Sequence, residues 1–255
     1  MRVSGRIGVS VLVALLTIGI CYAEAWGVFD KARAIVHNER GAQYLEKGQY
    51  DQAITEFTKA IELDPKFAWA YNNRGNAYAQ GKGQLDQAIS DFTKAIELDP
   101  KLAKAYNNRG GAYGDKGQYD QAISDCNKAI ELNPEYAQAY YNRGRAYLQK
   151  GQLDQAISDY TKAIELNPEI AMAYLNRAIT YAIKGEYDKA WEDVHKAQSL
   201  GFQVHPGFLK DLREASPEKS TGSREACEED CKQMFEKGEL RQGMTVEECI
   251  KGLCE

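Results

Sequence analysis

The sequence has few of the side chains from which catalytic and metal sites are usually built. Its three histidines, His37, His195 and His205, are scattered, and none lies at the spacing of a metal ligand set or a catalytic triad. The glycine-rich stretch from Gly81 to Gly83 lacks the continuation of a phosphate-binding loop. No nucleophile lies in a recognisable pattern with a general base. We therefore predict a protein that is not an enzyme, with no catalytic residue, cofactor, resident metal or small-molecule substrate.

Clusters of basic residues are also missing. The chain has 32 Lys and Arg against 37 Asp and Glu, and its formal net charge is −5. A general nucleic-acid binder concentrates positive charge along the surface that meets the phosphates. The composition therefore predicts no nucleic-acid partner.

The sequence lacks an apolar run long enough for a typical membrane span. The longest run, Ile7 to Ile20, is shorter than the ~20 residues that cross a bilayer. Arg2 and Arg6 precede it, and small residues around Ala23 follow it, which is the layout of a secretory signal. We predict a signal peptide over residues 1–25 and export to a bacterial periplasm or to the outside. Lipidation at Cys21 and an uncleaved anchor are the less favoured alternatives.

Most of the remaining chain is a tandem repeat. Near-copies of one unit open at Ala34, Ala68, Ala103, Ala137 and Ala171, at spacings of 34, 35, 34 and 34 residues. We number these repeats one to five, over residues 34–67, 68–102, 103–136, 137–170 and 171–204. In repeat three, Tyr106, Gly110 and Tyr113 share one helical face, Gly117 ends that helix, and a second helical pattern stops before Pro134. Each repeat therefore predicts a helix A, a turn and a helix B, with Gly110 and Ala122 where the two helices cross.

The repeats resemble the tetratricopeptide repeat. Its pattern is present as Tyr71-x2-Arg74-Gly75-x2-Tyr78, then Ala88-x3-Phe92 and Pro100, and later copies keep the spacing with Ala122-x3-Cys126 and Ala156-x3-Tyr160. The resemblance implies an all-α, right-handed superhelical solenoid of five helix-turn-helix units. Repeat two carries one extra residue between Ala79 and Gly83, which we expect in a turn. Repeat five has Ala178 in place of the patterned glycine.

Four segments flank the repeats. Residues 26–33 read as a short lead-in, residues 205–215 as a cap helix with Phe208, Leu209 and Leu212 on one face, and residues 216–223 as a linker. Residues 224–255 read as a cysteine-rich helical hairpin whose second helix opens with the capping box Thr245-x-x-Glu248.

The hairpin holds four of the six cysteines. In antiparallel order it would pair Cys227 with Cys254 and Cys231 with Cys249 as disulfides, which export favours; a zinc site is the rival interpretation. Cys126 stands at a core position that is aromatic in other repeats, and we expect a small buried hydrophobe there.

The resemblance also implies a binding surface, because helix A of this family lines a concave groove that receives a peptide or protein. Counting the opening alanine of each repeat as position 1, the groove is expected near positions 2, 5, 6, 9 and 12. The main candidates are Trp69, Asn72, Asn73, Asn76, Lys104, Asn107, Asn108, Gln138, Tyr141, Asn142, Arg145 and Asn176, and Gly111, Met172 and Leu175 stand at equivalent positions. The recurring asparagine at position 6 has a second interpretation, namely hydrogen bonding between adjacent helices. Asn72 stands where the family's carboxylate clamp has a lysine, so we do not expect that clamp.

A second recurring pair predicts a structural ladder. Arginine at position 7 is matched by aspartate at position 23: Arg74 with Asp91, Arg109 with Asp125, Arg143 with Asp159 and Arg177 with Asp193. We expect these ion pairs to tie helix A to helix B or to the next repeat.

Together the patterns predict a non-enzymatic scaffold or adaptor that binds a protein or peptide in the concave groove. The alternative is a redox-active or metal-binding cysteine hairpin that the repeats dock onto partners. A third possibility is weak self-association through the solenoid ends or the hairpins.

Overall fold

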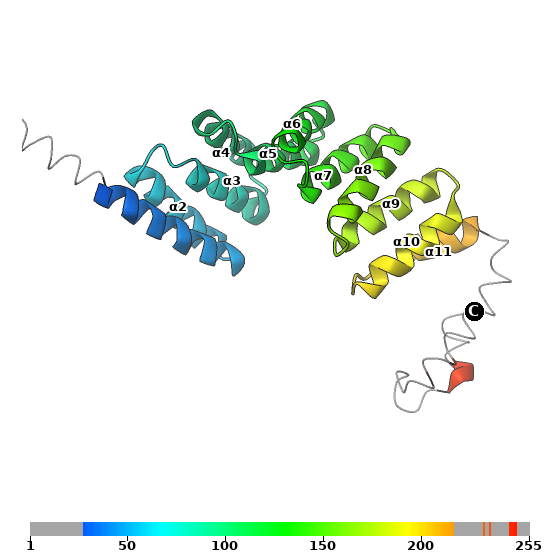
Figure 1. Cartoon of the computed structure of the whole chain (residues 1–255). Helices are drawn as coiled ribbons and strands as arrows, with labels where there is room; N and C mark the ends of the chain where they lie inside the picture. The colour runs from blue at the N-terminus through cyan, green and yellow to red at the C-terminus, as the bar shows by residue number, and fades with distance from the viewer. Residues whose placement is uncertain (1–27, 217–231, 233–234, 236–244, 249–255) are drawn as a thin grey trace, which may run out of the picture. The chain divides into compact units, whose positions relative to one another are not determined.

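The computed structural model describes residues 28–216, 232, 235 and 245–248. These residues form helices and no strand, so the predicted all-α solenoid of helix pairs is confirmed. The first helix spans residues 28–46. It is followed by α2 (Tyr50–Leu63), α3 (Ala68–Lys82), α4 (Leu85–Leu98), α5 (Ala103–Asp115), α6 (Tyr119–Leu132), α7 (Ala137–Gln149), α8 (Leu153–Leu166), α9 (Ala171–Ile183), α10 (Tyr187–Ser199) and α11 (Pro206–Ala215) (Figure 1). No described helix is both long and apolar enough to cross a membrane.

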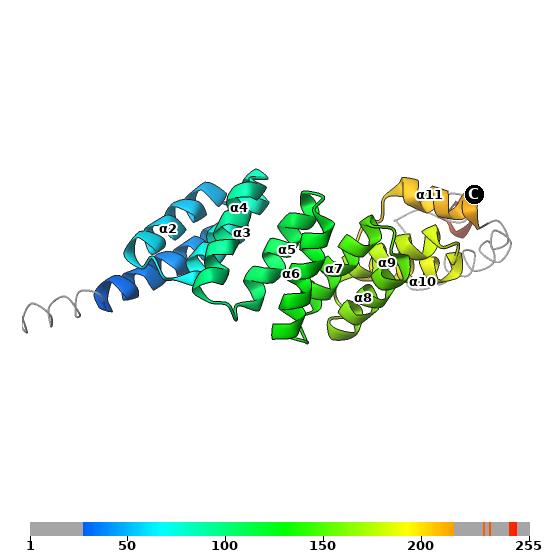
Figure 2. The same ribbon diagram turned by 90° about the horizontal axis from the view of Figure 1, so that it is seen from above.

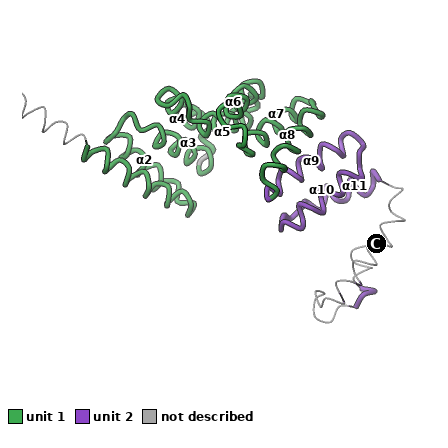
Figure 3. Tube along the Cα trace, viewed as in Figure 1, with its two compact units in different colours: residues 1–168 green, residues 169–255 purple. Residues whose placement is uncertain are grey.

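The chain divides into two compact units, residues 1–168 and residues 169–255 (Figure 3). In the first unit each repeat is a helix pair, and successive pairs are in contact through α2 and α3, α4 and α5, and α6 and α7 (Figure 2). The A helices are also neighbours, since α3 contacts α5 and α5 contacts α7. The second unit holds the pair α9 and α10, with α11 beside it.

Glycine and Asx residues define where the helices of a repeat end. Gly117 follows helix α5 with a φ of 76°, a left-handed conformation that glycine adopts without strain. At the end of the B helices, an aspartate or asparagine side chain accepts a hydrogen bond from the backbone two residues later, as Asp99 Oδ1 does from Lys101 N at 3.0 Å. These local signals explain why helix pairs recur with one period.

Small residues on helix A let the two helices of a pair approach. A Cβ on Gly75 would lie 2.7 Å from a ring carbon of Phe92, and a Cβ on Gly144 would lie 2.8 Å from the ring of Tyr160. Repeat five departs from this arrangement in both members: Ala178 replaces the glycine and Val194 replaces the ring. A smaller partner on helix B therefore leaves room for the methyl group of alanine.

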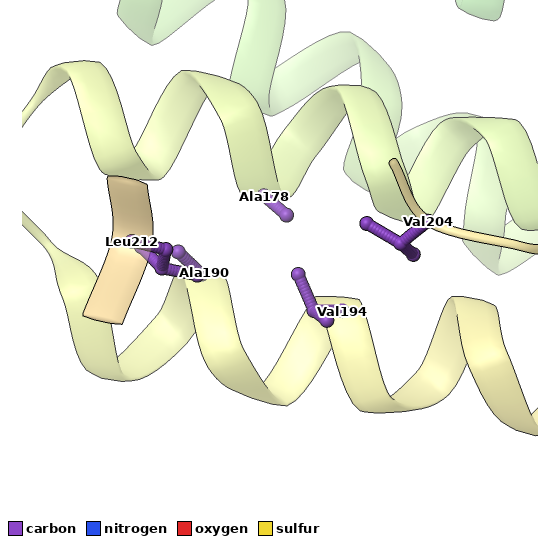
Figure 4. Close-up of a cluster of buried hydrophobic side chains, with 5 residues drawn as sticks. All are labelled: Ala178, Ala190, Val194, Val204 and Leu212. Carbon is purple, nitrogen blue, oxygen red and sulfur yellow. The ribbon is translucent and has the colours of Figure 1, made fainter. Parts of the chain in front are cut away.

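The core of the second compact unit consists of Ala178, Ala190, Val194, Val204 and Leu212 (Figure 4). Leu212 lies on α11 and is only 2% exposed. Phe208 and Leu209 of the same helix pack against this cluster. Helix α11 therefore covers apolar surface of the last helix pair.

Two expectations about the ends of elements were wrong. Residues 28–33 are no separate lead-in, because they belong to the helix that runs to residue 46. The extra residue of repeat two does not lie in a turn: α3 continues to Lys82 and is 15 residues long, against 13 for α5. The longer end of α3 places Gly81 against the ring of Tyr50, since a Cβ there would lie 2.1 Å from Tyr50 Cγ.

Several expectations fall on undescribed parts of the chain. The signal segment 1–25, most of the linker and the cysteines Cys227, Cys231, Cys249 and Cys254 lie outside the described residues. Within the tail, the capping box is confirmed, because Glu248 N donates to Thr245 Oγ1 at 3.2 Å and Thr245 N donates to Glu248 Oε2 at 2.9 Å.

Candidate binding face

The candidate site is the surface of the neighbouring A helices in the first compact unit, which we call the A-helix face. It comprises the predicted residues at positions 2, 5, 6 and 9 of α3, α5 and α7. Because these helices pack side by side, residues at one position form a row from repeat to repeat. Asn176, the twelfth predicted residue, lies on α9 in the second compact unit and is half-buried.

The residues at position 5 are buried, which contradicts their prediction as groove residues. Asn72 is 0% exposed, Asn107 is 2% exposed and Tyr141 is 8% exposed. Tyr141 points to the B helix of its own repeat, where its ring centroid lies 6.1 Å from that of Tyr160. Position 5 thus belongs to the packing between helices, and a ligand on the surface would not reach these side chains.

The asparagines at positions 5 and 6 form a chain of hydrogen bonds between repeats. At position 6, Asn73 donates to Asn38 at 3.0 Å, Asn108 donates to Asn72 at 3.0 Å, and Asn142 donates to Asn107 at 2.9 Å. Each acceptor is the position-5 residue of the preceding repeat.

Bonds within a repeat close the gaps in this chain. Asn72 donates to Asn73 at 3.2 Å, Asn107 donates to Asn108 at 3.3 Å, and Gln138 donates to Asn142 at 3.3 Å. The result is one directional series of amides from Gln138 to Asn38. The recurring asparagine therefore ties adjacent helices together, which was the second of the two interpretations left open by the sequence.

The accessible part of the A-helix face lies at positions 2 and 9. Trp69 is 43% exposed, and the ammonium nitrogen of Lys104 lies 5.7 Å from the centroid of its ring. This distance is within the range of a cation–π contact. Both residues occupy position 2, in adjacent repeats, so an apolar surface and a positive charge are presented together.

Position 9 differs in every repeat. Asn76 is half-buried on α3, Gly111 leaves α5 without a side chain, and Arg145 on α7 pairs with Asp115 at 3.0 Å. The Arg145 and Asp115 side chains are 43% and 48% exposed, so this ion pair is screened by solvent. Gly111 was expected at this position of the groove, whereas Asp115, at position 13 of repeat three, was not among the predicted residues.

The predicted Arg–Asp ladder is confirmed and lies behind this face. Arg109 Nε and Nη2 donate to the two carboxylate oxygens of Asp125 at 2.7 and 2.8 Å, and Nη1 donates to Thr93 of the preceding repeat at 3.1 Å. Its guanidinium lies between the rings of Tyr106 and Tyr113. The hydrogen bonds to Asp125 raise the pKa of Arg109, so the cation is firmly held. Arg74, Arg143 and Arg177 bind Asp91, Asp159 and Asp193 in the same way.

Repeat one replaces this ladder with a different pair. Its position-4 residue is His37, whose Nδ1 lies 2.7 Å from the Glu56 carboxylate, and Lys59 also donates to Glu56 at 2.7 Å. The hydrogen bond from Lys59, followed by that from His37, lowers the pKa of Glu56. These groups make a structural ion pair at the first helix pair. Among the described residues, no group of three or more His, Cys, Asp or Glu is placed to hold a metal ion.

Comparisons with known proteins agree with the helix-pair architecture. A family model described as TPR repeat matches residues 41–81 and 82–117, and models described as tetratricopeptide repeat match residues 103–136, 137–170 and 159–192. Among curated proteins, the chain is 34% identical over 55 residues to the chloroplastic tetratricopeptide repeat domain-containing protein PYG7 of Arabidopsis thaliana, covering 22% of this chain and 18% of that protein. It is 39% identical over 49 residues to RNA polymerase II-associated protein 3 of Homo sapiens, covering 19% and 7%. The matched segments thus span less than a fifth of these relatives.

Solved structures match over more of their length. MamA is 32% identical with a TM-score of 0.54, over 63% of this chain and 94% of that one. YrrB, described as a TPR protein with an unusual peptide-binding site, is 28% identical with a TM-score of 0.51, over 66% and 86%. PilF of Pseudomonas aeruginosa is 22% identical with a TM-score of 0.64, over 77% and 93%, and this likeness shows the fold alone.

Proposed function

Because the chain belongs to the tetratricopeptide repeat family, we propose that it is a non-enzymatic scaffold that binds a protein or an extended peptide on its A-helix face. The pattern of residues 1–25 supports a place outside the cytoplasm, in a bacterial cell envelope. One fold of this kind serves many functions, so the proposal rests on the particular side chains of the face.

The observation that carries the proposal is the exposed pair of Trp69 and Lys104. An indole that is 43% exposed offers a partner a large rigid apolar contact, and aromatic residues of this kind dominate binding energies at interfaces. The Lys104 ammonium beside it favours an acidic group on the same partner. At position 6 of repeats two, three and four, the half-buried Asn73, Asn108 and Asn142 can each offer a second N–H to a peptide backbone, since an amide nitrogen carries two donors and the series between repeats uses one.

The likeness to YrrB supports the same function, because that protein's description includes a peptide-binding site. The two proteins share the helix-pair architecture over 66% of this chain and 86% of that one.

Photo-crosslinking in cells tests the proposal. A photoreactive amino acid at position 69 should capture a partner, whereas the same group at Glu131 on α6, whose side chain is 66% exposed, should not. A Trp69→Ala, Lys104→Glu variant should lose the partner while keeping its helical circular dichroism, and Glu131→Ala serves as the matched control.

Two results would overturn the proposal. Equal capture of the partner from positions 69 and 131 would show that the partner does not bind preferentially to the A-helix face. Alternatively, a partner that survives the double substitution but is lost on deletion of residues 224–255 would place binding in the cysteine-containing tail.

A further inference from the structure

The first helix presents an apolar face to solvent. Val28 is 67% exposed, Phe29 69%, Ile35 49% and Val36 46%. At the turn of an α-helix these four residues and the exposed Ala32 lie within about 120° of one another. We call these five residues the N-terminal apolar face. A group of large apolar side chains on one helix marks an interaction surface, in contrast to scattered single residues such as Ile183.

The register of the repeats shows which packing partner the first helix lacks among the described residues, namely a preceding helix pair. Position 3 is alanine in repeats two to four, and Ala70, Ala105 and Ala139 are all 0% exposed. Ala70 packs against Ala34 and Ala60 of the preceding repeat. Repeat one has Val36 at position 3, and no helix pair precedes it among the described residues. Val36, the position-3 residue of the N-terminal apolar face, therefore lies where position 3 of each later repeat is covered by its predecessor.

We propose that this face binds the same face of a second copy of the chain, with the two first helices antiparallel. Its residues are symmetric in sequence about Ala32: Val28 and Val36 lie four residues to either side, and Phe29 and Ile35 lie three residues to either side. In an antiparallel pair centred on Ala32, Val28 meets Val36 of the partner, Phe29 meets Ile35, and the two alanines let the helices approach. A two-fold interface requires this kind of self-complementarity.

The charges of the first helix suit a second copy better than a lipid surface. Lys31, Arg33 and Arg40 are balanced by Asp30, Glu39 and Glu46, so the first helix carries no excess of positive charge. A helix that lies on an anionic membrane carries an excess of Lys and Arg beside its apolar face, and this one does not. The inference does not depend on the proposed function, because Trp69 and Lys104 are no part of the face.

Sedimentation equilibrium of the full chain tests the proposal. The wild type should be a dimer at micromolar concentration, and Phe29→Glu combined with Ile35→Glu should weaken association by at least about tenfold. Ile183→Glu is the matched control, because Ile183 is 60% exposed on α9 and lies outside the face. The control should remain a dimer, and both variants should keep the helical circular dichroism of the wild type.

Cysteine crosslinking tests the antiparallel geometry. A mixture of Val28→Cys and Val36→Cys chains should form an intermolecular disulfide faster than either variant alone, with the wild type measuring the background from native cysteines. A monomeric wild type, or a dimer unaffected by the two glutamates, would overturn the proposal. Two further results would overturn the proposal, because each shows a different occupant of the N-terminal apolar face. One is a monomeric chain that requires the face to bind anionic vesicles, and the other is a chain that dimerises only after deletion of residues 1–27.

Discussion

At the scale of single residues, the ladder arginines of repeats two, three and four each join three helices. Arg109 lies on α5, binds Asp125 on α6 through two nitrogens, and reaches Thr93 on α4 with the third. The Asp125 side chain is only 10% exposed, so this partner offsets the cost of burying its carboxylate. Repetition of the pair links the two helices of a repeat and also links neighbouring repeats.

Replacement of Arg109 by alanine should therefore be costly. It leaves a buried carboxylate unpaired, and we expect a loss of about 3–5 kcal/mol in the free energy of unfolding. Lys94→Ala is the control, because Lys94 pairs with Glu97 at the surface, where solvent screens the ion pair. Urea denaturation of both variants measures the difference. Equal urea midpoints for Arg109→Ala and the wild type would show that the ladder is dispensable.

The amide series makes a similar prediction for Asn108. Asn108→Ala removes the donor to Asn72, which is 0% exposed. A buried acceptor without a partner lowers the free energy of unfolding by about 1–3 kcal/mol. Asn76→Ala, on the same face but outside the series, should change stability by less than about 0.5 kcal/mol. Thermal unfolding compares the two, and a larger effect at Asn76 would contradict the assignment of the asparagines to inter-repeat bonding.

Tyr160 offers the opposite test, a stabilising substitution. Its ring is 0% exposed, and its hydroxyl has no hydrogen-bond partner among the described residues. Burial raises the pKa of this phenol, as expected for a group removed from water. Repeats one and two have phenylalanine at this position, so Tyr160→Phe should raise stability by about 1 kcal/mol. A lower melting temperature for Tyr160→Phe would reveal a partner for the hydroxyl.

At the scale of helices, packing within a repeat depends on matched small and large residues. Gly144→Ala places a methyl group 2.8 Å from the Tyr160 ring, and we expect a loss of about 1–3 kcal/mol. The same substitution at Gly111 should stabilise α5 by about 0.5–1 kcal/mol, because its Cβ would make only an ordinary contact at 3.5 Å.

A second substitution separates the clash from other effects. Repeat five already combines Ala178 with Val194, and both are 0% exposed. The double variant Gly144→Ala, Tyr160→Val should therefore lose less stability than the sum of the losses measured for the two single variants. Strictly additive urea midpoints for the two changes would show that Gly144 and Tyr160 do not act as a pair.

The sequence predicted these pairings because both partners recur with the period of the repeat. The Arg–Asp ladder and the helix pairs follow from register alone. The burial of position 5 could not be predicted from the register. A helical pattern shows that Asn72 and Asn73 are neighbours, but it does not show how deeply the next helix covers each side chain. The extra residue of repeat two was misplaced for a related reason: only the structure shows that Gly81 allows α3 to extend over Tyr50.

The apolar start of the first helix was missed for another reason. Val28 and Phe29 precede the opening alanine of repeat one, so the period assigned them to a lead-in. Their significance comes from exposure, which depends on what packs against the helix and cannot be read from spacing.

At the scale of the whole molecule, stability in a repeat array is local, because each helix pair contacts mainly its neighbours. Leu212 is 2% exposed in the core of the second compact unit, so Leu212→Ala should cost about 2–5 kcal/mol there. We expect amide hydrogen exchange to accelerate across α9, α10 and α11 and to stay unchanged in α2, α3 and α4. Phe208→Ala should act in the same region but less strongly, since Phe208 is only partly buried.

The distribution of exchange rates decides how the array unfolds. If Leu212→Ala accelerates exchange equally from α2 to α11, the chain unfolds as one cooperative body and the cap stabilises all of it. Acceleration confined to α9–α11 means that the cap stabilises only the pair it covers. In that case α11 protects the helix pair of the second compact unit, and the N-terminal apolar face, through a second copy, independently protects the first helix pair. Dimerisation should then slow exchange in the first helix and α2 without affecting α9–α11.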